Sequence, residues 1–136
     1  MIQIGREDLL RALKRFKGIA KQDLLPNNQI PQSDYWKTHA EARRETYTKL
    51  IDLVEEEGIE KACVFAFSAY QELPSSAEAN PDPVIKGHTQ ALEMFFNVLG
   101  IATDKLKKYK EENTDFHQIF GMSSPEDIYG QNLEAL

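Results

Sequence analysis

Apolar residues recur along the chain at the three- and four-residue spacing of amphipathic helices, which predicts four main helices. The expected ranges are 6 to about 17, 35–54, 59–73 and about 82–112. Ser33 is placed to cap the second helix, and Gly58 follows its closing glutamates, where a left-handed glycine ends many helices. Gly18 either ends the first helix or loosens its last turn. Two short helical turns are expected within 114–120 and 124–129.

The third segment, from Ile59 to Leu73, is apolar almost all round. Such a run is compatible with a buried strand, but its three alanines, its length and its helical surroundings favour a central helix. Phe65 and Phe67 are both expected in the core. The predicted fold class is therefore all-α: an irregular bundle of four main helices with a central apolar helix and a short helical C-terminal tail.

The fourth segment keeps one apolar phase on both sides of Gly100. Its stripe consists of Ile85, His88, Leu92, Phe95, Phe96, Leu99, Thr103 and Leu106. The constant phase predicts one continuous helix in which Gly100 is a weak point, because an exposed internal glycine costs about 1 kcal/mol relative to alanine. The stripe is longer than the third helix can cover, which predicts a homodimer with the fourth helix near its interface.

The 136 residues fit a single helical domain over 1–136, and the 41% hydrophobic and 28% charged residues are ordinary for a globular protein. No apolar run approaches the length that a membrane span needs, so we expect no membrane association. The N-terminal residues lack the apolar core of a secretory signal, and Cys63 is the single cysteine. These features predict a cytoplasmic protein.

The net charge of −6 conceals an asymmetry. Residues 1–22 hold six Lys or Arg against two Asp or Glu, whereas the rest holds ten against twenty. The basic first helix is therefore expected to dock on the acidic body of its own chain, where Glu55–Glu57 stand at a helix end that favours cations. Docking on the same chain is a simpler explanation than an acidic partner. Nucleic acid or an anionic membrane is also less favoured, because no aromatic side chain interleaves with the basic positions and the rest of the chain is acidic.

The second predicted helix carries two ionisable side chains, His39 and Arg43, on the face expected to point inward. Its inward stripe is Trp36, His39, Arg43, Tyr47, Leu50 and Val54. Arginine keeps its charge on burial, so Arg43 needs a carboxylate, a ligand anion or another chain. A pocket for a small anionic ligand would use Tyr35, Trp36, His39, Arg43, Tyr47 and His88. Two structural alternatives are favoured over this pocket: an ion pair within the chain or with a twin subunit, and an arginine lying along an aromatic ring.

Chemical signatures are otherwise weak. His39, His88 and His117 come from separate elements and would have to converge to bind zinc, without any pair at ligand spacing on one helix. Cys63 has apolar neighbours, which disfavours a nucleophilic thiolate. The chain has no glycine-rich phosphate loop, nucleophilic serine elbow or paired-carboxylate motif. We therefore expect no cofactor and no metal.

These observations predict a small non-enzymatic protein that acts by binding another protein, as a regulator or adaptor. The alternative is an enzyme or binder of a small anionic ligand that uses a niche formed by His39, Arg43 and His88. Nucleic-acid binding through the basic N-terminal helix ranks third.

Overall fold

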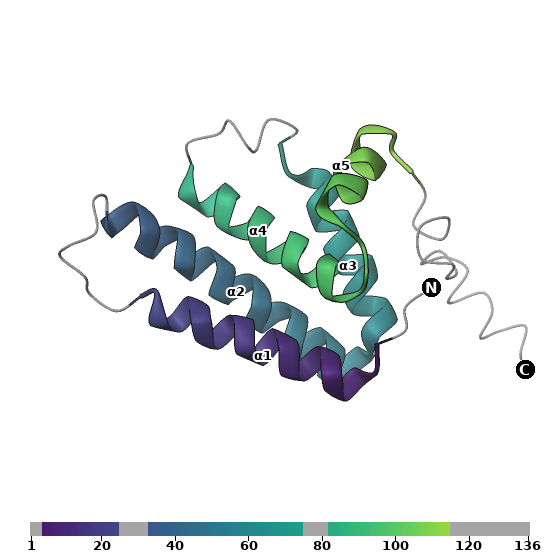
Figure 1. Ribbon diagram of the computed structural model, residues 1–136, viewed down its shortest axis with the longest axis horizontal. Coiled ribbons are helices and arrows are strands. Elements are labelled where there is room, and N and C mark those ends of the chain that lie inside the picture. Colours follow the sequence, from purple (N-terminus) through teal and green to yellow (C-terminus); the bar gives the residue numbers. More distant parts are fainter. Residues whose placement is uncertain (1–3, 25–32, 75–81, 115–136) are drawn as a thin grey trace, which may run out of the picture.

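The computed structural model describes residues 4–24, 33–74 and 82–114, and within them the chain forms five α-helices and no strand (Figure 1). The helices are α1 (Arg6–Gln22), α2 (Ser33–Glu57), α3 (Ile59–Glu72), α4 (Pro83–Val98) and α5 (Thr103–Glu111). The predicted all-α bundle is confirmed. The turns expected within 114–120 and 124–129 lie outside the described residues, apart from Thr114.

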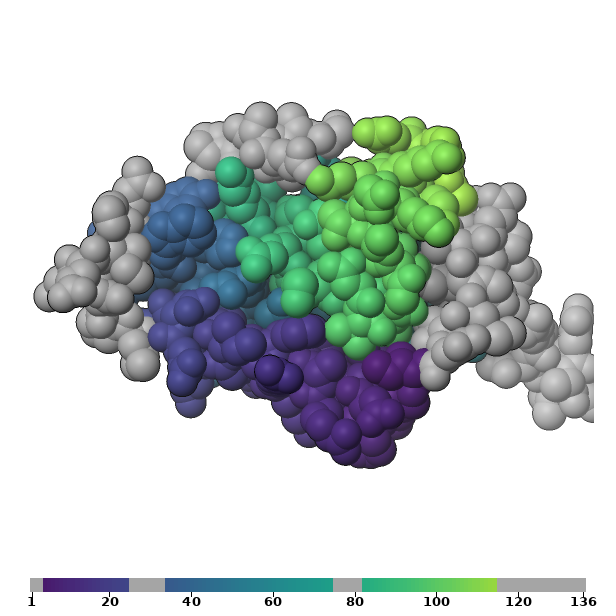
Figure 2. Space-filling view, viewed as in Figure 1, coloured from purple at the N-terminus to yellow at the C-terminus, as the bar shows by residue number. Residues whose placement is uncertain are grey.

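The centre of the bundle is α2, which corrects the central place predicted for the third helix. α2 packs against α1, α3 and α4, whereas α3 packs mainly against α2 (Figure 1). The space-filling view shows α1 and α4 closing over much of α2 on one face (Figure 2). The most deeply buried large side chains come from all five helices: Phe95, Phe96, Leu9, Leu13, Leu50, Leu106, Val54 and Cys63.

The basic α1 lies on the acidic end of α2, as predicted. Lys14 Nζ lies 3.5 Å from Glu55 Oε1, and Arg6 Nη2 donates to the Glu55 carbonyl oxygen at 3.5 Å. These cations face helix-end carbonyls and carboxylates, where the helix dipole favours positive charge. Lys14 and Glu55 are both well exposed, so the ion pair contributes only tenths of a kcal/mol up to about 1 kcal/mol. α1 also runs through Gly18 to Gln22, one turn beyond its predicted end.

The predicted continuous fourth helix is wrong, because α4 ends at Val98 and α5 begins at Thr103. Gly100 takes the left-handed φ of 97°, its N–H donates to Asn97 O at 3.0 Å, and the Ile101 N–H donates to Phe96 O at 2.9 Å. This pair of bonds is the Schellman motif, which satisfies the last carbonyls of a helix. Gly58, with φ 101°, ends α2 as predicted.

α2 and α4 approach most closely at Gly87. A Cβ placed on Gly87 would lie 2.5 Å from the His39 carbonyl oxygen and 2.7 Å from Ala42 Cβ. The absence of a side chain therefore lets the two helices touch through their backbones. This contact fixes how α4 lies on α2, and it sets His88 against Thr46 one residue further along. No helix among the described residues is long and apolar enough to cross a membrane.

Candidate functional site

Arg43 finds its partner within the chain. Arg43 Nη2 lies 2.6 Å from Oδ2 of Asp23, the residue that caps the C-terminus of α1. The Arg43 side chain is 11% exposed and that of Asp23 is 49% exposed, so the pair joins a buried cation to a hydrated carboxylate. The structural alternative predicted for Arg43, an ion pair with an acidic side chain of its own chain, describes what is seen.

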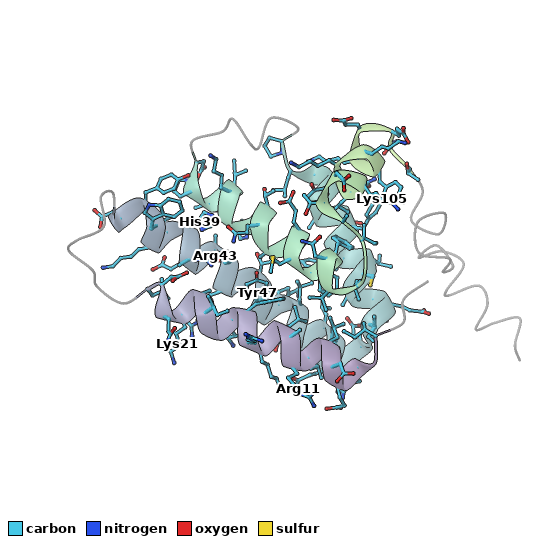
Figure 3. The ribbon with its side chains drawn as sticks, viewed as in Figure 1. Arg11, Lys21, His39, Arg43, Tyr47 and Lys105 are labelled. Carbon is cyan, nitrogen blue, oxygen red and sulfur yellow. The ribbon has the colours of Figure 1, made fainter. Side chains whose placement is uncertain are left out.

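His39 and Tyr47 lie one turn to either side of Arg43 along α2 (Figure 3). His39 is 6% exposed, and its Nδ1 has no hydrogen-bond partner, like Arg43 Nε. Burial lowers the pKa of His39, the positive charges of Arg43 and Lys86 lower it further, and Asp23 opposes them. Tyr47 is buried beside Phe16, with ring centroids 5.6 Å apart, and burial raises its pKa to about 12.

The aromatic residues of the predicted anion pocket, Tyr35, Trp36 and Tyr47, do not form one buried wall. Trp36 is 47% exposed, so its predicted place on the inward stripe is wrong. Its ring packs edge-on against Tyr35 and His39, with centroids 5.1 and 5.4 Å away. Trp36 lies in the first turn of α2. The stripe therefore becomes core only from His39 onward.

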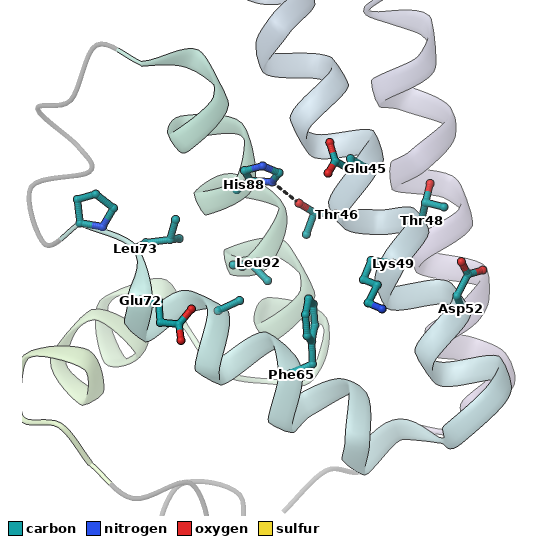
Figure 4. A pocket seen from close by; sticks show the side chains of 12 residues that line it. Glu45, Thr46, Thr48, Lys49, Asp52, Phe65, Glu72, Leu73, His88 and Leu92 are labelled. Atoms are coloured by element: carbon teal, nitrogen blue, oxygen red, sulfur yellow. Dashed lines mark hydrogen bonds between the residues drawn. The ribbon is translucent and has the colours of Figure 1, made fainter.

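His88 takes a different partner from the other predicted site residues. Its Nδ1 lies 2.6 Å from Thr46 Oγ1, and both residues line a groove bounded by α2, α3 and α4 (Figure 4). His39, Arg43 and Tyr47 do not line that groove. The structure thus brings His39 and Arg43 together beside Asp23, and it places His88 in a separate hollow.

The groove has a volume of about 600 Å³ and two walls of contrasting chemistry. α2 contributes a polar wall and α3 a largely apolar one, with His88 and Leu92 of α4 in the floor (Figure 4). Its lining residues are Glu45, Thr46, Thr48, Lys49, Asp52, Phe65, Ala69, Glu72, Leu73, Pro74, His88 and Leu92. The volume lies within the range of ligand-binding pockets, which is about 300–1,000 Å³.

The apolar wall arises from residues spaced by four along α3. Phe65 and Ala69 share one face of α3, and Leu73, which caps its C-terminus, follows at the same spacing. Each is only partly buried, although the neighbouring core positions are fully enclosed. Sequence reasoning assigned the whole segment to the core and therefore missed the groove. The four-residue spacing was visible in the sequence, but nothing in the sequence distinguished this face from the face that packs inward.

A polar cluster anchors the C-terminal end of α3. Lys110 Nζ of α5 donates to the Leu73 carbonyl oxygen at 2.7 Å and lies 5.0 Å from the Tyr70 ring centroid. The Tyr70 hydroxyl donates to Glu93 Oε2 at 2.9 Å, and burial raises the pKa of Glu93 against the opposing effects of this bond and of Lys110. These bonds tie α5 and α4 to the end of the groove wall.

Other chemistry finds little support in the described residues. Cys63 is fully buried, and burial raises its pKa to about 12, with Glu60 adding to the effect, so its thiolate is strongly disfavoured. Within 4–24, 33–74 and 82–114, no three His, Cys, Asp or Glu side chains group as metal ligands would. His117, the third histidine of the zinc hypothesis, lies outside the described residues.

Comparison with known proteins gives no match, either to a protein-family model, to a curated protein or to a solved structure.

Proposed function

We propose that this protein acts non-enzymatically, as a cytoplasmic regulator or adaptor, by binding another protein in the groove between α2 and α3. The observation that carries the proposal is the half-buried apolar stripe of Phe65, Ala69 and Leu73, which faces a polar wall across an open hollow. Helix-lined grooves with an apolar wall and a charged rim are a recurring mode of peptide recognition. A cytoplasmic setting suits the buried, unpaired Cys63.

A small anionic ligand beside Arg43 is the second candidate, and the unpartnered His39 Nδ1 and Arg43 Nε support it. Asp23 weakens this candidate, because its carboxylate already neutralises Arg43 at 2.6 Å.

The experiment tests the groove with two adjacent residues of α3. Ala69→Lys places a long cationic side chain on the apolar wall, whereas Ser68→Lys makes the same change in charge at an exposed position that does not line the groove. Proteins captured by the wild type from a cell extract of the source organism are purified, and their affinity for all three forms is measured by calorimetry. Circular dichroism and thermal melting confirm that the variants fold.

A partner that loses at least tenfold in affinity for Ala69→Lys and keeps its affinity for Ser68→Lys supports the proposal. The proposal fails if every captured partner binds both variants alike, or if no captured protein binds the purified chain.

A further inference from the structure

We infer that the groove binds an amphipathic helix of a partner protein, whose polar side carries Lys or Arg beside its apolar face. The inference rests on the proposed function and names the chemistry of the partner. Three features of the groove carry it: its hydrogen-bonding atoms are nearly all acceptors, its rim is acidic, and its apolar wall has helical spacing.

The threonine hydroxyls direct their protons away from the groove. Thr46 Oγ1 donates to the Ala42 carbonyl oxygen at 3.0 Å, and Thr48 Oγ1 donates to the Arg44 carbonyl oxygen at 2.8 Å. A hydroxyl has one proton, so only lone pairs remain for other partners. With the Thr46 proton on the Ala42 carbonyl oxygen, the 2.6 Å contact makes His88 Nδ1 the donor to Thr46 Oγ1.

Carboxylates dominate the rim. Glu45 and Asp52 line the α2 side and Glu72 the α3 side, and ionised carboxylates only accept hydrogen bonds. Lys49 is the one cation among the lining residues, and its Nζ lies 5.7 Å from the Phe65 ring centroid, so its charge stands over the apolar wall. An occupant therefore gains most by supplying donors with positive charge.

The apolar wall sets the shape of the occupant. Phe65, Ala69 and Leu73 lie along α3 and its C-cap, and the eight steps from 65 to 73 span about 12 Å at the rise of an α-helix. An amphipathic helix of about three turns has an apolar stripe of that length. The groove is only partly enclosed, whereas pockets for small ligands enclose most of their ligand's surface. A helix lying along the groove fits this shape better than a small cation does.

The chain's own segments do not supply the required charge. No Lys or Arg occurs in residues 1–3, 25–32, 75–81 or 115–136, and the last of these segments holds four acidic residues. The basic helix α1 of a second copy is also unsuitable, because its apolar residues Leu9, Leu10 and Leu13 are already buried in its own core. The occupant's cations must therefore come from a different molecule.

The test uses the full chain and three designed 14-residue peptides. The first is an amphipathic helix of Leu and Lys, the second replaces every Lys by Glu, and the third scrambles the Leu/Lys sequence so that no apolar face forms. Affinities are measured by calorimetry, and backbone amide shifts locate the binding site by NMR. We expect the Leu/Lys helix to bind at least tenfold more tightly than either of the others, with shifts at Ala69 and Leu92.

Two matched double variants separate the rim from net charge. Asp52→Asn with Glu72→Gln removes two groove carboxylates, whereas Glu56→Gln with Glu111→Gln removes two exposed carboxylates that do not line the groove. We expect the first pair to weaken Leu/Lys binding about fivefold to tenfold, as for two exposed ion pairs, and the second pair to change it less than twofold.

The inference is overturned if the Leu/Glu or the scrambled peptide binds as well as the Leu/Lys helix. It is also overturned if both double variants lose affinity equally, which would show attraction to net charge only, or if the shifts map outside the groove. The proposed function and this inference can be distinguished by their outcomes. If a protein partner is sensitive to Ala69→Lys but binds through an acidic or non-helical segment, the function stands and this inference does not.

Discussion

At the scale of single residues, the sequence showed that Arg43 needs a counter-charge but not which residue provides it. The reason is physical: a guanidinium on an inward helix row must be paired, whereas the choice of Asp23 depends on where the end of α1 lies beside α2. Asp23 is also half-exposed, so the carboxylate is hydrated from one side. Removing Arg43 therefore leaves the Asp23 carboxylate unpaired but still in contact with solvent, which costs less free energy than leaving a fully buried charge unpaired.

We predict that Arg43→Ala lowers the free energy of unfolding by about 1–3 kcal/mol, because packing and a charge-assisted hydrogen bond are both lost. Arg43→Met should cost less than about 1 kcal/mol, because it keeps the stem and removes the orphan Nε. Urea denaturation measures both changes. A loss in Arg43→Met equal to that in Arg43→Ala would show that the ion pair, and not the packed stem, provides the stability.

We predict that His39 makes the fold sensitive to acid. Its pKa is lowered from 6.5 in the folded protein, so below that pH the unfolded chain binds more protons and stability falls as the pH falls. His39→Gln should flatten the curve of unfolding free energy against pH in this window. The difference between the two curves isolates the imidazole, because Glu93, whose raised pKa acts in the opposite direction, is common to both. Parallel curves would contradict the prediction.

At the scale of helices, the hydrophobic period located all the main segments but not every connection. The period shows which face of a helix is apolar, but not where the helix ends. The turn over residues 99–102 keeps the apolar spacing of α4, so Leu106 is fully buried although it belongs to a separate helix, α5. α4 ends there because Gly100 adopts a left-handed conformation and the Gly100 and Ile101 N–H groups form the Schellman hydrogen bonds. The close approach of α2 to Gly87 was also not predictable, because the residues around Gly87 in the sequence do not indicate which helix packs against it.

Two glycines within helices should respond oppositely to alanine. Gly87→Ala should destabilise the protein by about 1–3 kcal/mol, because the new Cβ meets the backbone oxygen of His39. Gly18→Ala should stabilise it by about 0.5–1 kcal/mol, because no atom lies within 4 Å of a Cβ there and alanine favours helix. Thermal melting of both variants gives the signs. Equal responses would show that α2 and α4 can separate at little cost.

Alanine substitutions on the two faces of α3 should lower the free energy of unfolding by different amounts. Phe67 is 4% exposed and packs against Phe96 at a centroid distance of 6.4 Å, so Phe67→Ala should cost about 3–5 kcal/mol. Phe65 lines the groove, and the corresponding loss should be about half as large, because less of its ring leaves a packed environment. Denaturant titration compares them. A larger loss for Phe65→Ala would place the groove face in the core.

At the scale of the whole molecule, the groove could not be foreseen from the sequence. It exists because α2 and α3 diverge from Gly58 while α4 fills only the floor between them, and this geometry follows from the packing of all three helices. Most of the predicted site residues were chosen from one face of α2, and the fold uses most of that face as core. Charge asymmetry was more informative, since it predicted that α1 docks on the acidic end of α2.

The homodimer stays a prediction, but its expected interface changes. The α4 stripe is covered by α2, with Leu92, Phe95 and Phe96 buried within one chain, so it is not available to a second copy. Within the described residues, the exposed large apolar side chains are Ile19, Trp36 and Val84. They belong to the end of α1 and the starts of α2 and α4, which Figure 1 shows at one end of the molecule.

We therefore expect light scattering at micromolar concentration to give about twice the chain mass of 15.6 kDa, through two-fold packing of these ends. Trp36→Ser combined with Val84→Ser should return the mass to that of one chain and lower the melting temperature only slightly, because close to half of each residue is already exposed in the single chain. Lys105→Ser with Lys108→Ser, at exposed positions on α5, is the control and should leave the dimer intact. A wild-type protein with the mass of a single chain would remove the dimer from consideration and leave the groove open to a partner.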